Sequence, residues 1–177
     1  MRFAGGTWTL FSSSAPAIRG RIGRAFAVAT GVTIAFASAG ALAAPTTFGP
    51  IIGSALLCRS HLDNAYFHSY LSSAFGPSYK HEGGAYWFKA DGNLWGAQVT
   101  DILLSDDTSE LVFVGAVSEV APDKLDEAIR ASVGVRHEAT DKSAFPVRQS
   151  RPGSKIVYFN NKSKIYCAQY KPLPILR

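Results

Sequence analysis

Two cysteines, Cys58 and Cys167, are the residues of this chain with the clearest chemical role. A pair of cysteines in an oxidising compartment is typical of one structural disulfide. Closing a loop of about 110 residues would stabilise the fold by roughly 4 to 5 kcal/mol through the entropy of the unfolded chain. The alternative is that Cys58 is a nucleophile with His61 one helical turn away. No reactive-cysteine pattern surrounds either residue, so we favour the disulfide.

Four histidines raise the question of a metal site. His61 and His68 are seven residues apart, about 10 Å along a helix, which is too far for one ion to bridge. His81 and His137 stand in predicted loops. We therefore expect no metal and no cofactor. An enzyme site would have to form in three dimensions, and its candidate residues are then His61, His68, His137 and Glu119.

Sequence motifs for catalysis are absent. The chain has neither a Gly-x-Ser-x-Gly nucleophile elbow nor a Ser-x-x-Lys pair, and it has no glycine pattern that cradles phosphate. Carboxylates are adjacent at positions 106–107 and 126–127, but both pairs are expected in solvent, where their pKa values do not suit acid–base catalysis. The sequence therefore favours a non-enzymatic protein.

Aromatic residues are concentrated between Tyr66 and Trp95, where they make up nine of thirty positions. Strand alternation over residues 85–90 sends some of these rings to each face of a sheet, so part of the aromatic surface is expected to remain exposed. Aromatic residues with polar tips are favoured anchors of protein interfaces. The candidate interface residues are Tyr86, Trp87, Trp95 and Phe67. The alternative is an aromatic-rich core, because aromatic side chains bury the most area per residue.

Residues 1–44 are predicted to be a cleavable export signal. They combine basic residues with no acid, an apolar run over residues 25–39, and small residues at the cleavage positions of Ala41-Leu42-Ala43. The basic residues are Arg2, Arg19, Arg21 and Arg24. No other stretch approaches the roughly 20 apolar residues of a membrane helix. We therefore expect a periplasmic or secreted protein that does not span a membrane, with one globular domain over residues 45–177.

The positive net charge of the chain comes mainly from this leader. The whole chain has 18 Lys and Arg against 13 Asp and Glu, but without the four leader arginines the balance is 14 minus 13, or +1. A nucleic-acid partner is therefore not expected. Ten acids stand between residues 99 and 141, whereas residues 142–177 contain eight bases and no acid. Folding brings these segments together, or else the surface is bipolar and steers a charged partner.

The pattern of apolar residues predicts an α+β domain with the order α-β-β-β-α-β-β. We expect an antiparallel sheet of about five strands with two helices packed on it, because tight hairpins leave no room for parallel crossovers. The predicted helices span residues 54–75 and 122–133. The predicted strands span residues 85–90, 94–105, 111–120, 155–159 and 163–170, with a short additional strand near 147–149 and turns at 91–93 and 160–161.

The spacing of apolar residues also predicts which side chains share a face of each element. On the first helix, the core stripe is expected to contain Ala55, Cys58, Leu62, Ala65 and Tyr66. A second apolar group is formed by Leu56, Phe67, Leu71 and Ala74. On the last strand, Ile165 and Cys167 point to one face, and Lys164 and Tyr166 to the other. The disulfide would then join the first helix to the last strand.

Together these features predict a small exported binding or interaction protein without enzymatic activity, whose partner is another protein. An inhibitor or an immunity protein that blocks another protein's active site is one form of this function. Two alternatives stay open. One is a small periplasmic hydrolase whose site forms only in three dimensions, and the other is a structural component of the cell envelope.

Overall fold

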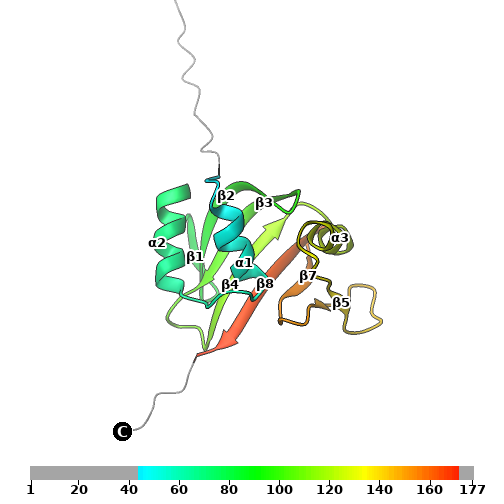
Figure 1. Ribbon diagram of the computed structural model, residues 1–177. Helices are drawn as coiled ribbons and strands as arrows, with labels where there is room; N and C mark the ends of the chain where they lie inside the picture. Colours follow the sequence, from blue (N-terminus) through cyan, green and yellow to red (C-terminus); the bar gives the residue numbers. More distant parts are fainter. Residues whose placement is uncertain (1–43, 172–177) are drawn as a thin grey trace, which may run out of the picture. The chain divides into compact units, whose positions relative to one another are not determined.

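The computed structural model describes residues 44–171 (Figure 1). The predicted leader lies outside these residues, apart from Ala44. Eight antiparallel strands form one sheet in the order β1-β2-β3-β4-β8-β7-β6-β5. The helical elements are the π-helical turn η1 (Gly49–Gly53), α1 (Ser54–Leu56), α2 (Asn64–Phe75) and α3 (Pro122–Val133). The strands are β1 (Lys80–Glu82), β2 (Ala85–Leu94), β3 (Ala97–Ser105), β4 (Leu111–Ser118), β5 (Glu138–Ala139), β6 (Arg148–Gln149), β7 (Lys155–Phe159) and β8 (Lys162–Tyr170).

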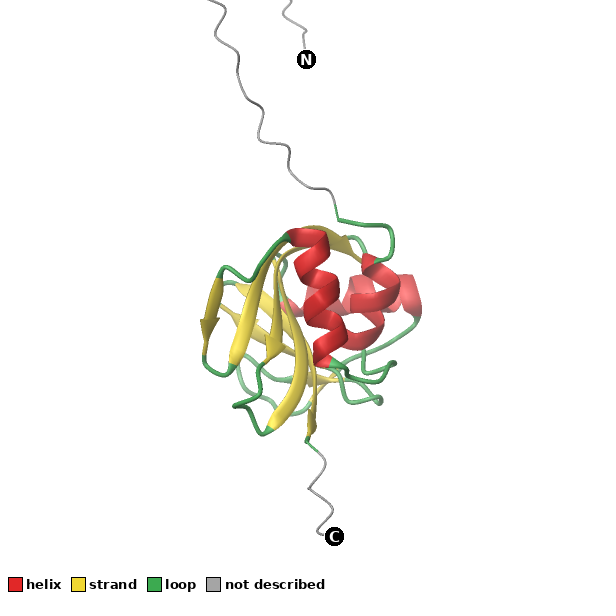
Figure 2. Ribbon diagram, turned by 90° about the vertical axis from the view of Figure 1, so that its left-hand side faces the viewer, coloured by secondary structure: helices red, strands yellow, loops and turns green. Residues whose placement is uncertain are grey.

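The predicted α+β class is confirmed, but the predicted five strands and two helices are too few. The described residues contain eight strands and three α-helices. The short additional strand expected near 147–149 is present as β6, whereas β1 and β5, with three and two residues, were not predicted because they are too short for a periodic pattern to reveal. All the helices lie on one face of the sheet (Figure 2). In the described part of the chain, no helix covers the opposite face.

The prediction of one helix over residues 54–75 is wrong, because the chain breaks the helix at Cys58. Cys58 adopts a left-handed backbone conformation with φ of 55°. A new helix, α2, begins only at Asn64, where the side chain of Asp63 accepts a hydrogen bond from the backbone N–H of Tyr66 at 3.0 Å. An aspartate at this capping position satisfies a backbone donor that the first helical turn leaves free.

This break also changes which face of the helix is buried. Ala65 and Tyr66, both in the predicted core stripe, are exposed, and Tyr66 is 51 % exposed. The core receives Ala55 and Leu62 from the predicted stripe, together with Leu56, Phe67 and Leu71, which belong to the second apolar group. A helical wheel drawn through residues 54–75 assumes one unbroken helix, and the interruption at 57–63 rotates α2 relative to α1.

The first long hairpin also differs from the prediction. The expected turn at 91–93 lies inside β2, which continues to Leu94 with a register shift between Lys89 and Gly92. The chain turns at Trp95 and Gly96, where φ is 56° and 86°. Two consecutive positive φ values are typical of the tight turns that join twisted strands.

The second half of the fold follows the prediction closely. Helix α3 spans the predicted residues 122–133 and ends at Gly134, whose φ of 71° is the left-handed conformation that glycine adopts easily. The last hairpin turns at Asn160 and Asn161, with φ of 48° and 63°, and β8 begins one residue earlier than expected. Local signals suffice here because each element carries its own start and stop residues.

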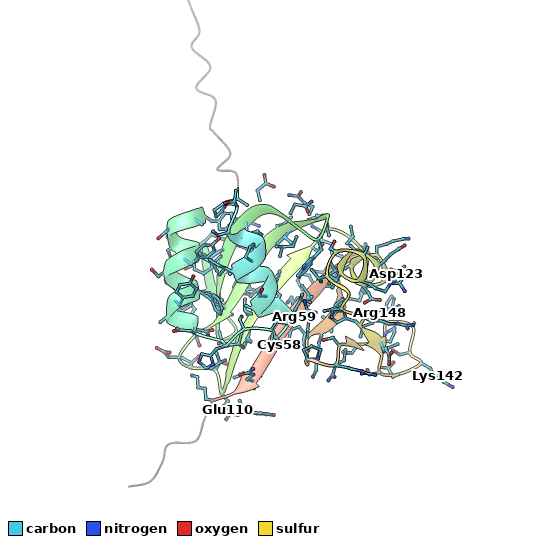
Figure 3. The ribbon with its side chains drawn as sticks, in the orientation of Figure 1. Cys58, Arg59, Glu110, Asp123, Lys142 and Arg148 are labelled. Atoms are coloured by element: carbon cyan, nitrogen blue, oxygen red, sulfur yellow. A yellow bond between two sulfur atoms is a disulfide. The ribbon has the colours of Figure 1, made fainter. Side chains whose placement is uncertain are left out.

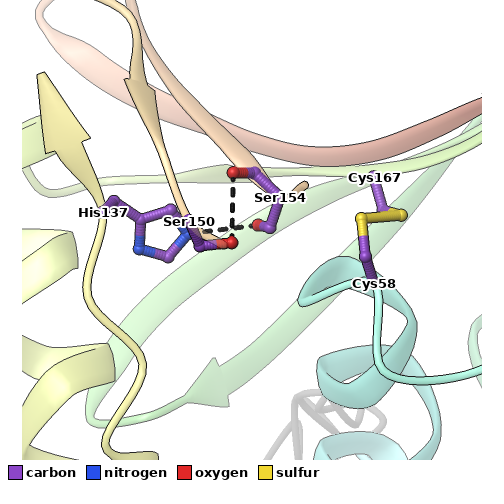
Figure 4. The surroundings of a disulfide bond; sticks show 5 residues. All are labelled: Cys58, His137, Ser150, Ser154 and Cys167. Atoms are coloured by element: carbon purple, nitrogen blue, oxygen red, sulfur yellow. Dashed lines mark hydrogen bonds between the residues drawn. A yellow bond between two sulfur atoms is a disulfide. The ribbon is translucent and has the colours of Figure 1, made fainter. Parts of the chain in front are cut away.

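The predicted disulfide between Cys58 and Cys167 is confirmed, with an S–S distance of 2.03 Å (Figure 4). It joins Cys58, two residues beyond the end of α1, to the core face of β8. The side chain of Cys167 is fully buried together with Ile165. Both sulfurs are consumed by this bond, which removes the alternative of a nucleophilic Cys58.

Candidate functional site

The candidate site lies on the face of the sheet that has no helix, which we call the open face. The strand register places one continuous row of residues across it: Lys80, Trp87, Leu103, Gly115, Tyr166 and Lys155. Neighbouring members of this row are directly opposite each other on adjacent strands, so their side chains share one face. A second row on the same face contains Lys89, Asp101, Val117, Lys164 and Val157.

An apolar groove of about 360 Å³ runs over this face. Its aromatic walls are Trp87, Phe113 and Tyr166. Leu103 and Gly115 stand between Trp87 and Tyr166 in the register, so one of the two middle positions of the row has no side chain. A Cβ atom at Gly115 would lie 3.5 Å from Cβ of Tyr166 and 3.7 Å from Cβ of Leu103. The glycine therefore gives the groove its depth, and a larger residue would fill it.

Two lysines flank the indole of Trp87. The Nζ atoms of Lys80 and Lys164 lie 5.0 and 5.2 Å from the centre of the ring, distances at which a cation is attracted by the aromatic face. Lys164 Nζ also lies 4.2 Å from the ring centre of Phe159. Within residues 44–171, the indole N–H of Trp87 is buried and has no hydrogen-bond partner. A donor and two cations therefore gather at one end of the groove.

Lys164 differs from Lys80 and Lys89 on the open face because it has no carboxylate within 4.0 Å in the described part of the chain. Lys80 pairs with Glu82 at 2.5 Å, and Lys89 pairs with Asp101 at 2.7 Å. Burial lowers the pKa of Lys164, and the positive charge of Lys80 lowers it further. An anionic group brought to this point would relieve both effects.

A hydrogen-bonded network fixes the side chains beside the groove. Asp101 accepts hydrogen bonds from Tyr79 at 2.8 Å, from Lys89 at 2.7 Å and from Thr100 at 2.8 Å. Burial raises the pKa of Asp101, but the hydrogen bonds from Lys89, Thr100 and Tyr79 outweigh burial, and the net pKa is lowered. Asp101 is therefore ionised and fully engaged. It holds this part of the open face in place and does not neutralise Lys164.

Of the four residues predicted as an interaction surface, one lies in this groove. Trp87 forms its wall, whereas Tyr86 points to the helical face and stacks on His81 with 4.2 Å between ring centres. Phe67 is 3 % exposed and belongs to the core. Trp95 lies at the β2–β3 turn, where its ring would meet a Cβ atom on Gly53 at 3.4 Å. The structure does not bring these four side chains together.

Phe113 and the pair Lys164 and Tyr166 are the site residues that the sequence analysis did not select. As expected, alternation along the last strand places Lys164 and Tyr166 on one face of the sheet and Ile165 and Cys167 on the other face. Their proximity to Trp87 depends on β4 lying between β3 and β8, which is a property of the strand order. A pattern along one strand contains no information about its neighbours.

The candidate enzyme residues do not form one site. His61 is exposed, and His68 packs edge-on against Tyr86 at 4.9 Å between ring centres. Glu119 pairs with Lys162 at 2.5 Å, and no hydrogen bond joins Glu119 to His61, His68 or His137. Among residues 44–171, no three histidine, cysteine or acidic side chains are grouped in a way that would hold a metal ion.

His137 does lie in a chain of hydrogen bonds with a serine and an aspartate. Its Nδ1 is 3.2 Å from Oδ1 of Asp126. Its Nε2 is 3.2 Å from Oγ of Ser154, and Figure 4 shows this second contact. The order of these groups resembles that of a serine hydrolase. However, Ser154 and the side chain of His137 have no exposed surface. Burial lowers the pKa of His137, with Asp126 acting in the opposite direction.

The acidic segment 99–141 and the described part of the basic segment, 142–171, form few ion pairs with each other. Only one of the ion pairs in the described residues, Lys162 with Glu119, joins the segment 99–141 to the segment 142–171. The other paired acids of the first segment, such as Asp101, find partners elsewhere or within their own segment. Part of the basic segment lies on the open face, because β7 and β8 contribute Lys155, Lys162 and Lys164 to it.

Comparisons with known proteins do not identify a relative. No family model matches the chain, and no curated protein or solved structure shows significant similarity to it. Among residues 44–171, no helix has the length and apolar character needed to cross a membrane.

Proposed function

We propose that this chain is an exported, non-enzymatic binding protein that holds a partner protein on the open face of its sheet. The observation that carries this proposal is the groove of about 360 Å³ between Trp87 and Tyr166, with Gly115 at its floor. The leader-like composition of residues 1–44 and the disulfide between Cys58 and Cys167 support export. Blocking another protein's active site is one way in which such a face would act.

The chemistry of the groove favours an acidic partner with an apolar anchor. An aromatic or aliphatic side chain would pack between Trp87 and Tyr166, in the kind of desolvated pocket where interface energy concentrates. A carboxylate beside that anchor would meet Lys164, whose Nζ lies 5.2 Å from the ring centre of Trp87. Hydrogen bonds to charged groups contribute about 1.5 to 3 kcal/mol each, so this contact would supply much of the specificity.

Site-specific photo-crosslinking tests the proposal directly. A photoreactive amino acid in place of Ala168, which lines the groove, should capture one partner protein in cells that export the chain. The same probe in place of Phe145, which is 65 % exposed and far from the groove in the sequence, serves as the matched control. Capture of the same proteins from both positions would contradict the proposal.

A charge reversal at the groove provides the second arm of this experiment. Lys164→Glu should abolish crosslinking from position 168, because it replaces the unpaired cation at the groove with an acid. Lys142→Glu makes the same charge change at an exposed site outside the groove and should leave crosslinking intact. Circular dichroism and unfolding curves of both variants verify that each one folds. A folded Lys164→Glu variant that still captures the partner would argue against this role of the lysine.

A hydrolase is the alternative that a specific observation favours, namely the contacts among Asp126, His137 and Ser154. The complete burial of Ser154 argues against it, because a nucleophile must reach its substrate. A fluorophosphonate probe labels activated serines, and we expect it to leave the protein unlabelled. Labelling that disappears in Ser154→Ala would establish the hydrolase and exclude a purely structural role for this histidine.

A further inference from the structure

A second hollow, separate from the groove on the open face, is lined by three arginines. It has a volume of about 460 Å³, and its charged lining consists of Arg59, Arg136, Arg151 and Glu138. We call it the arginine hollow. It shares no lining residue with the groove, so what it binds does not depend on the function proposed above.

The three arginines come from three separate segments that line one hollow, and two of these segments lie next to the disulfide. Arg59 follows Cys58 directly (Figure 3), and its guanidinium donates to the carbonyl of Val133 at 3.5 Å, at the end of α3. Arg136 stands two residues beyond Gly134. Arg151 lies in the turn between β6 and β7, and this turn reaches the disulfide, because a Cβ atom on Gly153 would lie 3.9 Å from Sγ of Cys58.

Within the part of the chain that the structure describes, these arginines have no carboxylate partner. All 13 Asp and Glu residues of the chain lie within the described range 44–171, and none places a carboxylate within 4.0 Å of a described arginine. Arginine stays protonated at every physiological pH. With three cations and one acid, Glu138, the lining carries a formal charge of 3 minus 1, or +2.

The neighbouring hollow beside α3 makes a useful contrast. Its lining adds three acids, Asp123, Asp126 and Glu127, to the basic residues Arg130 and Arg148. It shares Arg136 and Glu138 with the arginine hollow. Its four carboxylates therefore outnumber its three arginines. Of these two neighbouring hollows, only the arginine hollow has an excess of positive charge.

We propose that the arginine hollow binds a phosphate group, carried by a small phosphorylated molecule or by a lipid headgroup. Guanidinium groups match the oxygens of phosphate with pairs of parallel hydrogen bonds, and they are less strongly hydrated than an ammonium group. A dianionic phosphate neutralises the +2 charge of the lining. The hollow is larger than one phosphate requires, so the remainder of the ligand occupies the space beside Gln149 and Pro152.

Titration with pyrophosphate tests this site on the full-length, oxidised protein. Calorimetry at low ionic strength should detect binding, and two-dimensional NMR should show shifts of the backbone amides near residues 134–136 and 151–153. Arg151→Gln should weaken binding about tenfold, the effect of losing one charge-assisted contact. Lys142→Gln removes the same charge from a loop outside the hollow and should change affinity less than about twofold (Figure 3).

Two further variants separate guanidinium recognition from general attraction. Arg151→Lys keeps the charge but should still weaken binding severalfold, because an ammonium does not form the paired hydrogen bonds. Glu138→Gln removes the only acid of the lining and should tighten binding severalfold. Arg136→Gln repeats the test at a second position in case Arg151→Gln fails to fold. Equal losses in Arg151→Gln and Lys142→Gln, or full affinity in Arg151→Lys, would overturn the proposal.

Vesicles distinguish the two sources of phosphate. Sedimentation with phosphatidylglycerol vesicles, but not with phosphatidylcholine vesicles, should be lost in Arg151→Gln if the ligand is a lipid headgroup. Binding of pyrophosphate without sedimentation indicates a small phosphorylated ligand. Absence of binding to both probes would refute the site. All of these outcomes are independent of Lys164 and the groove, so failure here would leave the function proposed above unaffected.

Discussion

Reduction of the disulfide between Cys58 and Cys167 should destabilise the fold strongly. The bond joins residues 109 positions apart, and the loss of loop-closure entropy in the unfolded chain stabilises the folded state by at most about 5 kcal/mol for such a loop. Residual structure in the unfolded state reduces this effect, so we expect a decrease of about 3 to 4 kcal/mol in the free energy of unfolding. Domains of this size are stable by roughly 5 to 15 kcal/mol in total.

The corresponding change in melting temperature follows from the entropy of unfolding. For about 130 ordered residues this entropy is near 0.27 kcal/mol per kelvin, so a loss of 3 to 4 kcal/mol lowers the midpoint by roughly 11 to 15 °C. Urea unfolding of the oxidised and the reduced protein, followed by tryptophan fluorescence, measures the free energy without altering the sequence. The reduced protein should also show a larger dependence on urea, because its unfolded chain exposes more surface.

The double variant Cys58→Ala/Cys167→Ala is the control for the reducing agent. Its stability should not respond to reductant, and it should fall somewhat below that of the reduced wild type, because Cys167 is fully buried and the truncation leaves a small void. Equal midpoints for oxidised and reduced wild type would refute the reasoning. Such a result would mean that the unfolded chain keeps its two ends together without the bond.

Two other predictions concern pH and packing. The pKa of His137 is lowered by burial, so between that pKa and about 6.5 only the unfolded state binds the proton. The free energy of unfolding should therefore rise with pH through this window and level off above it. Urea unfolding at a series of pH values should show that His137→Gln flattens this rise. The same substitution at exposed His61 is the control and should leave the rise unchanged. Gly92→Ala would place a Cβ atom 2.9 Å from the ring of buried Phe48 and should destabilise the fold by about 1 to 3 kcal/mol. In the control Gly49→Ala, the new Cβ atom meets no atom within 4 Å, so this variant should be neutral or stabilising. Thermal melting of both variants measures the difference.

The sequence predicted those parts of the fold that carry local signals. Helix α3 begins at Pro122 and ends before Gly134, and the last hairpin turns at two asparagines, so both were predicted within a residue. The disulfide was predicted because only one pairing is possible with two cysteines. These features depend on the residue types at a few neighbouring positions or on simple counting, and tertiary contacts do not alter them.

The errors arose where a distant contact overrides the local pattern. Residues 54–75 have enough apolar spacing for one helix, but the left-handed conformation at Cys58 interrupts it next to the disulfide. Likewise, Asp91-Gly92-Asn93 has the composition of a turn, yet Gly92 lies inside β2, where the ring of Phe48 fits against it. Glycine serves equally in a turn and at a close approach, and composition does not distinguish these uses.

The sequence by itself determined the class of the fold, the single disulfide, the excess of aromatic residues and the uneven distribution of charge. Only the tertiary structure decided which of these residues meet. Strand order places Trp87 of β2 in one groove with Lys164 and Tyr166 of β8, and the packing of three distant segments places Arg59 in one hollow with Arg136 and Arg151. The physical reason is that periodicity sets the direction of a side chain within its own element, whereas its neighbours depend on how elements distant in sequence pack together.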